Sequence, residues 1–292
     1  ILFMIFSGIC YSFSTVWTVL VADYGVDDLM LTFIRLSFAA FTMLVILSLT
    51  KKGIKINYAE FKTTAIFGIS GTALTIFLMS KAAGEMSAGS VSLCHYSYPI
   101  LVALASTVIY KEKFSINKIL TSILMFCGLL VANNGGSMNI LGIVYSLLSA
   151  VAFAFYVFGQ EHSVMFKMDP FKLFFWCTFS GTIAILILLL MTGNFMLPSS
   201  VEVYGFMACG GIVSDLCGTV FLFYGVRKLG AAKAAFLEVL EPGLAFVWDF
   251  VIFGAKISLT SIIGVTLIFL SFIVMITPFD KIITNKIKIY QN

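Results

Sequence analysis

Long runs of apolar residues alternate with short polar clusters along the whole chain. A helix needs about 20 mainly apolar residues to cross the hydrocarbon core of a bilayer. Turn-forming clusters such as Lys51-Lys52-Gly53 separate these runs, and Asp169-Pro170 is a helix start. The pattern predicts an all-α integral membrane protein with ten transmembrane helices at roughly 1–22, 29–50, 61–80, 86–109, 116–133, 140–160, 171–192, 203–226, 231–253 and 260–277.

Composition narrows the classes of protein that fit this pattern. The chain has 292 residues, of which 60% are hydrophobic and 11% are charged, and its mean hydropathy is +1.06. Ten spans of about 20 residues occupy about 200 positions, so the connections are short. No room remains for a soluble catalytic domain or a nucleic-acid-binding domain. The first residue is Ile1 rather than Met, so we expect further residues to precede it.

The basic residues predict the orientation of the chain, because cytoplasmic loops are enriched in Lys and Arg. One alternate set of loops contains only Lys81 and Lys256. The other set contains fifteen basic residues: Lys51, Lys52, Lys55, Lys62, Lys111, Lys113, Lys118, Lys167, Lys172, Arg227, Lys228, Lys233, Lys281, Lys286 and Lys288. We therefore expect both termini to be cytoplasmic, and the Lys content and short loops favour a bacterial inner membrane.

An internal repeat appears when the sequence is shifted by 143 residues. The shift places Pro99 on Pro242 and Ser115 on Ser258, and a shift of 139 places Ser7 on Ser146. The predicted domains are two five-helix repeats at 1–135 and 136–278, followed by a basic cytoplasmic tail at 279–292. Because five is odd, the second repeat enters the membrane from the opposite face. Inverted repeats of this kind are typical of secondary transporters, whose substrate site lies near the midplane between the halves.

Several segments resemble a known family over nearly the whole chain. They are the stretch from Pro99 to Ile116, its second copy from Pro242 to Leu259, Phe33-Ile34-Arg35 and the segment 224–234. The chain resembles the ten-helix EamA-type branch of the drug/metabolite transporter superfamily. That resemblance implies a membrane transporter rather than an enzyme. Members of the superfamily carry amino acids, cationic drugs, sugar nucleotides and other metabolites.

Ionisable residues inside predicted spans are candidates for the substrate site, because each costs roughly 2.5–3.5 kcal/mol to insert. Glu238, Glu241 and Asp249 share one face of the ninth span. Glu238 and Glu241 are interpreted as cavity-facing and substrate-binding, whereas Asp249 lies near the outer interface and is expected to be hydrated. Pro242 follows Glu241, and we expect Pro99 and Pro242 to act as hinges.

The repeat places two further candidates opposite these acids. The 143-residue shift sets His95 on Glu238 and Tyr98 on Glu241, so both are candidate substrate-binding residues, although a lone histidine is often only packed. Asp215, midway along the eighth span, has no basic neighbour within a turn and is also interpreted as cavity-facing. We predict that Asp215 and Glu238 couple transport to protons.

Three aromatic or basic positions complete the candidate set. Trp17 and Tyr156 correspond under the 139-residue shift and are interpreted as lining the cavity. Small hydroxyl residues on the same faces, Ser7 and Ser146, are expected to serve helix packing. Arg35 has two interpretations: it reaches the interface and pairs with Asp27 or Asp28, or it acts as a gate or substrate contact.

These residues favour a negatively charged cavity with aromatic walls. The leading hypothesis is a secondary carrier that moves a small cationic or zwitterionic metabolite, such as an amino acid, an amine or a drug-like cation, by alternating access coupled to protons or exchange. The alternative is an exchanger of anionic sugar-nucleotide or phosphate-type metabolites. An enzyme is disfavoured, because no HExxH or GxSxG motif is present, and the absence of a GxxxxGK[ST] loop excludes ATP-driven transport. A channel is disfavoured, because it would need a continuous polar pore, whereas the inverted repeat already supplies a substrate site.

Few partners are expected beyond the substrate, the bilayer and protons. The six cysteines include no CxxC pair, so neither a disulfide framework nor a metal site is predicted, and no cofactor is expected. The expected oligomeric state is a monomer or a weak homodimer.

Overall fold

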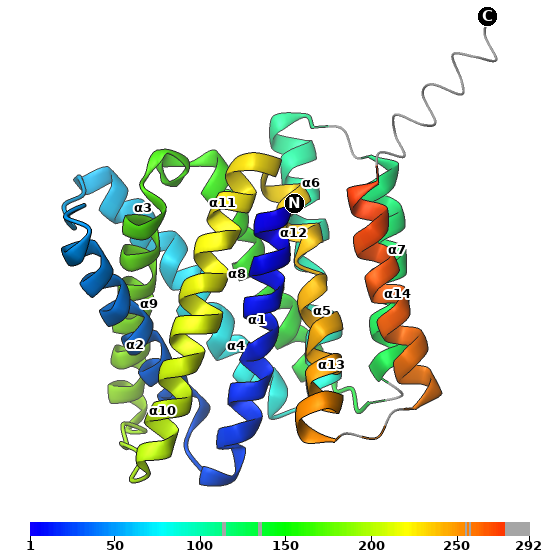
Figure 1. Cartoon of the computed structure of the whole chain (residues 1–292), viewed down its shortest axis with the longest axis horizontal. Coiled ribbons are helices and arrows are strands. Elements are labelled where there is room, and N and C mark those ends of the chain that lie inside the picture. The colour runs from blue at the N-terminus through cyan, green and yellow to red at the C-terminus, as the bar shows by residue number, and fades with distance from the viewer. Residues whose placement is uncertain (113–114, 134–135, 255, 257, 278–292) are drawn as a thin grey trace, which may run out of the picture.

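The computed structural model describes residues 1–112, 115–133, 136–254, 256 and 258–277, and every structural statement below refers to these residues. The chain is an all-α bundle (Figure 1). The α-helices are α1 (Leu2–Val21), α2 (Asp28–Leu49), α3 (Tyr58–Gly68), α4 (Thr75–Ala83), α5 (Ala88–His95), α6 (Tyr98–Tyr110), α7 (Ile116–Asn133), α8 (Ile140–His162), α9 (Pro170–Thr192), α10 (Val201–Cys209), α11 (Thr219–Leu229), α12 (Ala231–Leu237), α13 (Leu240–Phe253) and α14 (Leu259–Ile276). Short 3₁₀ turns are η1 (Ala22–Tyr24) and η3 (Val164–Lys167), and π-helical segments are η2 (Ile69–Leu74) and η4 (Gly210–Gly218).

These elements make the ten helices that the hydropathy pattern predicts. Nine described stretches are long and apolar enough to cross a membrane. The remaining helix, the ninth in chain order, is α12 followed by α13; it is interrupted at Glu238 and Val239 and therefore has no single long stretch. The predicted boundaries agree within a few residues, except that the third and eighth helices each run through a π-helical segment.

Helix starts follow ordinary capping chemistry. Asp27 caps α2 by accepting hydrogen bonds from two backbone N–H groups, and Asp169 caps α9 in the same way. Asn57 and Glu60 form a reciprocal capping box at the start of α3. The predicted helix start at Asp169-Pro170 is confirmed.

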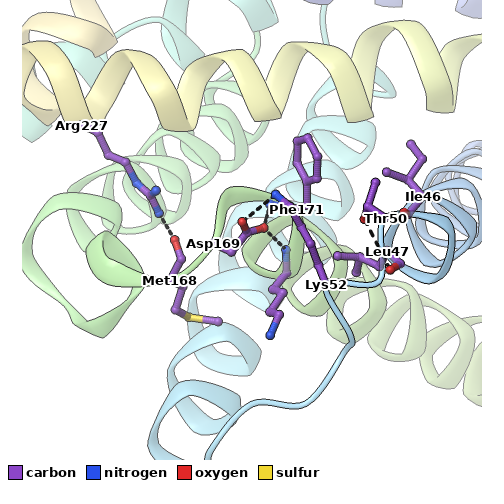
Figure 2. A network of polar contacts seen from close by, with 9 residues as sticks. Ile46, Leu47, Thr50, Lys52, Met168, Asp169, Phe171 and Arg227 are labelled. Carbon is purple, nitrogen blue, oxygen red and sulfur yellow. Dashed lines mark hydrogen bonds and ion pairs between the residues drawn. The ribbon is translucent and has the colours of Figure 1, made fainter.

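The loops at the end of the bundle where α1 begins are tied together by polar contacts. Figure 2 shows Lys52, from the loop after α2, beside Asp169 and Phe171 at the start of α9. The Lys52 ammonium lies 2.8 Å from the Asp169 carboxylate and 4.2 Å from the centre of the Phe171 ring. Arg227 donates to the carbonyl of Met168. These contacts join the second, seventh and eighth helices at one end.

The helix packing brings the two halves of the chain together. α1 packs against η4 and α13, α2 packs against α9 and η4, and α8 packs against α4, α6 and η2. α7 and α14 form a pair at one side of the bundle (Figure 1). The fourth and ninth helices, which carry the candidate residues, meet where α12 contacts α6.

The two chain repeats run in opposite directions through the bundle. α1 starts at one end and, after five helices, α8 starts at the other end, while α14 finishes at the end where α1 started (Figure 1). The predicted tail at 279–292 lies outside the described residues.

Candidate functional site

The site is centred on Glu238, which lies at the interruption between α12 and α13. Its side chain is buried, with 2% of the residue exposed. The Ser7 hydroxyl of α1 lies 2.7 Å from Glu238 Oε1 and 2.9 Å from the carbonyl oxygen of Gly218. The second carboxylate oxygen, Oε2, is buried and has no hydrogen-bond partner among the described residues. Ser7 was expected to serve packing only, so its contact with the acid was missed.

Three tyrosines interact with the two acids. Tyr11 and Tyr98 interact electrostatically with both Glu238 and Glu241, and so does Tyr96. The Tyr11 hydroxyl is also hydrogen-bonded to Thr219 at 2.7 Å. Tyr11 and Tyr96 were not among the candidates. Tyr11 lies one turn beyond Ser7 on α1, so the spacing of four residues contained the signal.

Asp215 is held by an ion pair that the sequence did not suggest. Arg35 Nε lies 2.8 Å from Asp215 Oδ2, and Arg35 Nη1 donates to the Ser14 hydroxyl at 2.9 Å. Both charged side chains are mostly buried, with 16% and 12% exposed. The contact between Nε and Oδ2 is an ion pair without the alignment of a hydrogen bond.

The expected pairing of Arg35 with Asp27 or Asp28 is therefore wrong. Asp27 is occupied as the N-cap of α2, and Asp28 accepts a hydrogen bond from Ser80. The sequence neighbours of Asp215 include no cation. Because α2 packs against η4, Arg35 of α2 reaches Asp215 of η4. The deep charge count also changes, because of the three deep acids only Asp215 forms an ion pair among the described residues.

His95 lies at the other helix interruption, between α5 and α6, and its side chain contacts hydroxyl and aromatic groups. Its Nδ1 is 2.8 Å from the Ser149 hydroxyl, and its ring contacts Tyr96, Tyr98 and Phe153. Ser149 donates in turn to the carbonyl of Ser146. The structure thus places Tyr98 with the two acids, whereas His95 faces the hydroxyls of α8.

Trp17 and Tyr156 occupy related positions on opposite sides of the bundle. A Cβ on Gly210 of η4 would lie 3.2 Å from Trp17 Cδ1, and a Cβ on Gly71 of η2 would lie 2.3 Å from Tyr156 Cγ. Each aromatic ring therefore packs against a π-helical segment of the other repeat. Trp17 is near Arg35 rather than Glu238, and its indole N–H is buried without an acceptor in the described part of the chain.

Comparison with known proteins identifies the family to which the chain belongs. Residues 1–134 and 140–277 match the EamA-like transporter family. The chain belongs to the EamA-like transporter family. It is similar to the uncharacterized transporter YdfC of Bacillus subtilis, with 28% identity over 203 residues that cover 68% of this chain and 66% of that protein. An uncharacterized transporter of Clostridium kluyveri is 22% identical over 290 residues, covering 94% of this chain and 91% of its own length.

A solved structure supports the same fold. It superposes with a TM-score of 0.81 at 14% sequence identity and covers 94% of this chain and 96% of its own. The EamA protein is therefore an integral membrane transporter of the drug/metabolite transporter superfamily, built from two EamA repeats, and it is not an enzyme.

In this EamA protein, the two helix interruptions lie directly before the repeat-related prolines. Pro99 is the second residue of α6 and Pro242 is the third residue of α13, and neither can donate a helical hydrogen bond to the preceding turn. The residues four positions back are His95 and Glu238. The broken helices thus place a titratable side chain of each repeat at the point where the backbone ladder is incomplete.

Proposed function

We propose that this transporter moves a small zwitterionic or cationic organic solute by alternating access, and that protonation of Glu238 and Asp215 couples the movement to a proton gradient or to exchange. The observation that carries the proposal is the contact chain from Glu238 through Ser7 to the carbonyl of Gly218. Glu238 remains the candidate binding group for the cationic part of the solute.

The Ser7 hydroxyl has one proton and two acceptors within reach. When Glu238 is ionised, Ser7 donates to Oε1 and stabilises the charge. When Glu238 is protonated, the acid donates to Ser7 Oγ and Ser7 turns its proton to the Gly218 carbonyl, which lies 2.9 Å away. Rotation of one hydroxyl keeps Glu238 Oε1 hydrogen-bonded in both protonation states, so this contact tolerates the titration that coupling requires.

The charges of the site favour an ammonium group. Glu238 Oε2 lacks a partner, and a substrate N–H donor would supply one. The aromatic rings of Tyr98 and Tyr156 add cation–π attraction for an ammonium group, whereas Trp17 lies nearer Arg35. A proton and an ammonium ion then compete for the same carboxylate, which links their movements in opposite directions.

The Arg35–Asp215 pair favours a zwitterion among such solutes. A substrate carboxylate can take the place of Asp215 on Arg35 while the ammonium group lies at Glu238 or Glu241, and Arg35 already interacts with Glu241. Protonation of Asp215 would release Arg35 for that exchange. The anionic sugar-nucleotide alternative is disfavoured, because it requires several uncompensated cations and Arg35 is paired.

The experiment is uptake into proteoliposomes of amines, amino acids and nucleotide sugars, with and without an imposed pH gradient. Glu238→Gln and Asp215→Asn keep the side-chain shape and remove titration, so gradient-driven uptake should fall at least about tenfold. Asp249→Asn, in the same helix as Glu238 but half-exposed, is the matched control and should retain uptake. Size-exclusion profiles establish that each variant is folded. Full gradient-driven uptake by the Glu238→Gln, Asp215→Asn double variant would overturn the coupling mechanism, and coupling would then be assigned to Glu241 and His95.

The orientation is a separate part of the proposal. We expect the end of the bundle that contains Lys52 and Lys55 to face the cytoplasm of a bacterial cell, with both termini on that side. A cysteine at Lys55 should resist an impermeant thiol reagent in intact cells, and a cysteine at Ser199 should react. Labelling of Lys55→Cys and protection of Ser199→Cys would show that the protein has the opposite orientation in the membrane.

A further inference from the structure

Three potential metal ligands meet at the end of the bundle where α1 begins (Figure 1). Glu112 lies two residues after Tyr110, the last residue of α6, and Glu161 and His162 are the last two residues of α8. The three are distant from the transport site. They were not recognised in the sequence, because Glu112 belongs to the first repeat and the other two to the second.

The ligand atoms are close enough to share one ion. One oxygen of each glutamate and one ring nitrogen of His162 all lie within 4.8 Å of one another. A point therefore exists no more than about 2.8 Å from all three atoms, and metal–ligand distances of about 2.0–2.2 Å require only a small contraction. Two carboxylates and one imidazole are a ligand set used by Zn²⁺ and by related divalent ions.

The histidine is oriented for such a role. The ring of Tyr110 stacks on His162 with ring centres 3.9 Å apart, and Phe158 packs against it at 4.4 Å. His162 Nε2 is buried, lies 3.7 Å from Glu161 Oε2, and has no hydrogen-bond partner among the residues that the structure describes. An imidazole nitrogen held in place without a partner is suited to bind a metal ion.

Residues outside the cluster hold the two glutamate side chains in place. Glu161 accepts a hydrogen bond from the backbone N–H of Ala231 at the start of α12. Glu112 lies 3.9 Å from Lys118 Nζ of α7, so part of the negative charge is already compensated. Lys118 offsets only part of the charge of −2 on the two carboxylates, so a cation bound between them is still attracted electrostatically.

We propose that Glu112, Glu161 and His162 form a binding site for a divalent transition-metal ion, with Zn²⁺ as the representative ion. The ion joins the end of α6 in the first repeat to the end of α8 in the second. Through Glu161 it also holds the start of α12, whose other end leads to Glu238. Metal binding therefore restrains the two broken helices at this end of the bundle and stabilises the folded transporter.

The test is Zn²⁺ titration of the purified protein by calorimetry, followed by X-ray absorption at the zinc edge. We expect one Zn²⁺ per chain and a first shell of nitrogen and oxygen at about 2.0–2.1 Å, without the sulfur shell at about 2.3 Å that cysteine ligands would give. His162→Gln and Glu112→Gln should each weaken binding at least about tenfold, and the increase in unfolding temperature with Zn²⁺ should disappear.

Glu85→Gln is the matched control, because Glu85 is an exposed acid outside the cluster whose carboxylate accepts a hydrogen bond from the Asn139 amide. It should bind Zn²⁺ as the unchanged protein does. A sulfur shell, or equal affinity in the His162→Gln variant, would overturn the proposal, as would the absence of binding. None of these measurements requires a transport substrate, so the outcome is independent of the proposed function.

Discussion

Two helix contacts of this transporter are related by its internal repeat but differ in chemistry. In one, α2 of the first repeat packs against η4 of the second; in the other, α9 of the second repeat packs against η2 of the first. A shift of 142 residues superposes the N-caps Asp27 and Asp169 of α2 and α9, and a shift of 143 places Gly68 before η2 on Gly211 in η4.

The backbone geometry of the two contacts is alike. A Cβ on Gly211 would lie 2.3 Å from the carbonyl oxygen of Arg35, and a Cβ on Gly68 would lie 2.5 Å from that of Cys177. Under the 142-residue shift, Arg35 and Cys177 are equivalent. In both contacts, glycine thus allows one helix to approach the backbone of the other within a distance that any side chain would prevent.

The side chains that line the two contacts are not alike. The first contact contains the ion pair between Arg35 and Asp215, whereas the equivalent positions in the second are Cys177 and Thr72. Thr72 donates to the carbonyl of Gly68, within its own helix. Because the second contact packs as closely without any charge, the close approach of the two helices does not require an ion pair.

The largest expected effect is the loss of one partner of the pair. Arg35→Met leaves Asp215 buried without a cation, and we expect the free energy of unfolding to fall by about 3–5 kcal/mol. Thr72→Val, at the position equivalent to Asp215, should cost less than about 1.5 kcal/mol. Thermal unfolding of both variants in detergent measures the difference. Equal losses would show that the two contacts are energetically equivalent.

A second variant converts the charged contact to the uncharged one. Arg35→Cys with Asp215→Thr copies the residues of the second contact, so the double variant should recover most of the roughly 3–5 kcal/mol lost by the single change. Substrate uptake should remain low despite that recovery. A double variant with the stability of Arg35→Met would mean that the ion pair is structural, and normal uptake would remove it from the transport mechanism.

The shared backbone approach is tested by the two glycines. Gly211→Ala and Gly68→Ala each place a methyl group against a backbone carbonyl, and we expect each to destabilise the protein by about 1–3 kcal/mol. Gly205→Ala is the control, because a Cβ at Gly205 would meet no atom within 4 Å. Unfolding temperatures that change at only one of the two close glycines would contradict the equivalence of the contacts.

The smallest effect concerns the two N-caps. Burial raises the pKa of Asp169, but hydrogen bonds from Lys52 and from the N–H groups of Phe171 and Lys172 lower it by more, so the net pKa lies below its ordinary value. Asp169 therefore stabilises the folded state above the pKa of the unfolded chain, and this contribution is lost as the pH falls through its folded-state pKa.

Because Asp169 is partly exposed, the contribution should be below about 1 kcal/mol. Unfolding curves between pH 7 and pH 3 should show a smaller acid-induced loss in Asp169→Asn than in the unchanged protein. Asp27→Asn is the matched variant, and identical acid sensitivity of all three proteins would show that Lys52 contributes nothing to the cap.

The candidate site could be predicted only in part. Glu238 and Glu241 stand out because a charge in an apolar span is rare, and the repeat correctly relates the interruptions at His95 and Glu238. The partner of Asp215 could not be found, because Arg35 lies 180 residues away and no local spacing relates the two. Ser7 was missed for a different reason: a small hydroxyl on a helix face has the same pattern whether it packs or donates to an acid.

The hydrophobic pattern by itself determined the membrane fold, the ten helices and the repeat. These properties depend on the length and polarity of contiguous segments, because every backbone group inside a bilayer must be satisfied within its own helix. Only the tertiary structure decided which charges are compensated, which hydroxyl faces Glu238, and that Glu112 meets His162. Such contacts depend on how helices from the two repeats pack side by side, and two repeats with closely similar backbones hold an ion pair in one contact and uncharged side chains in the other.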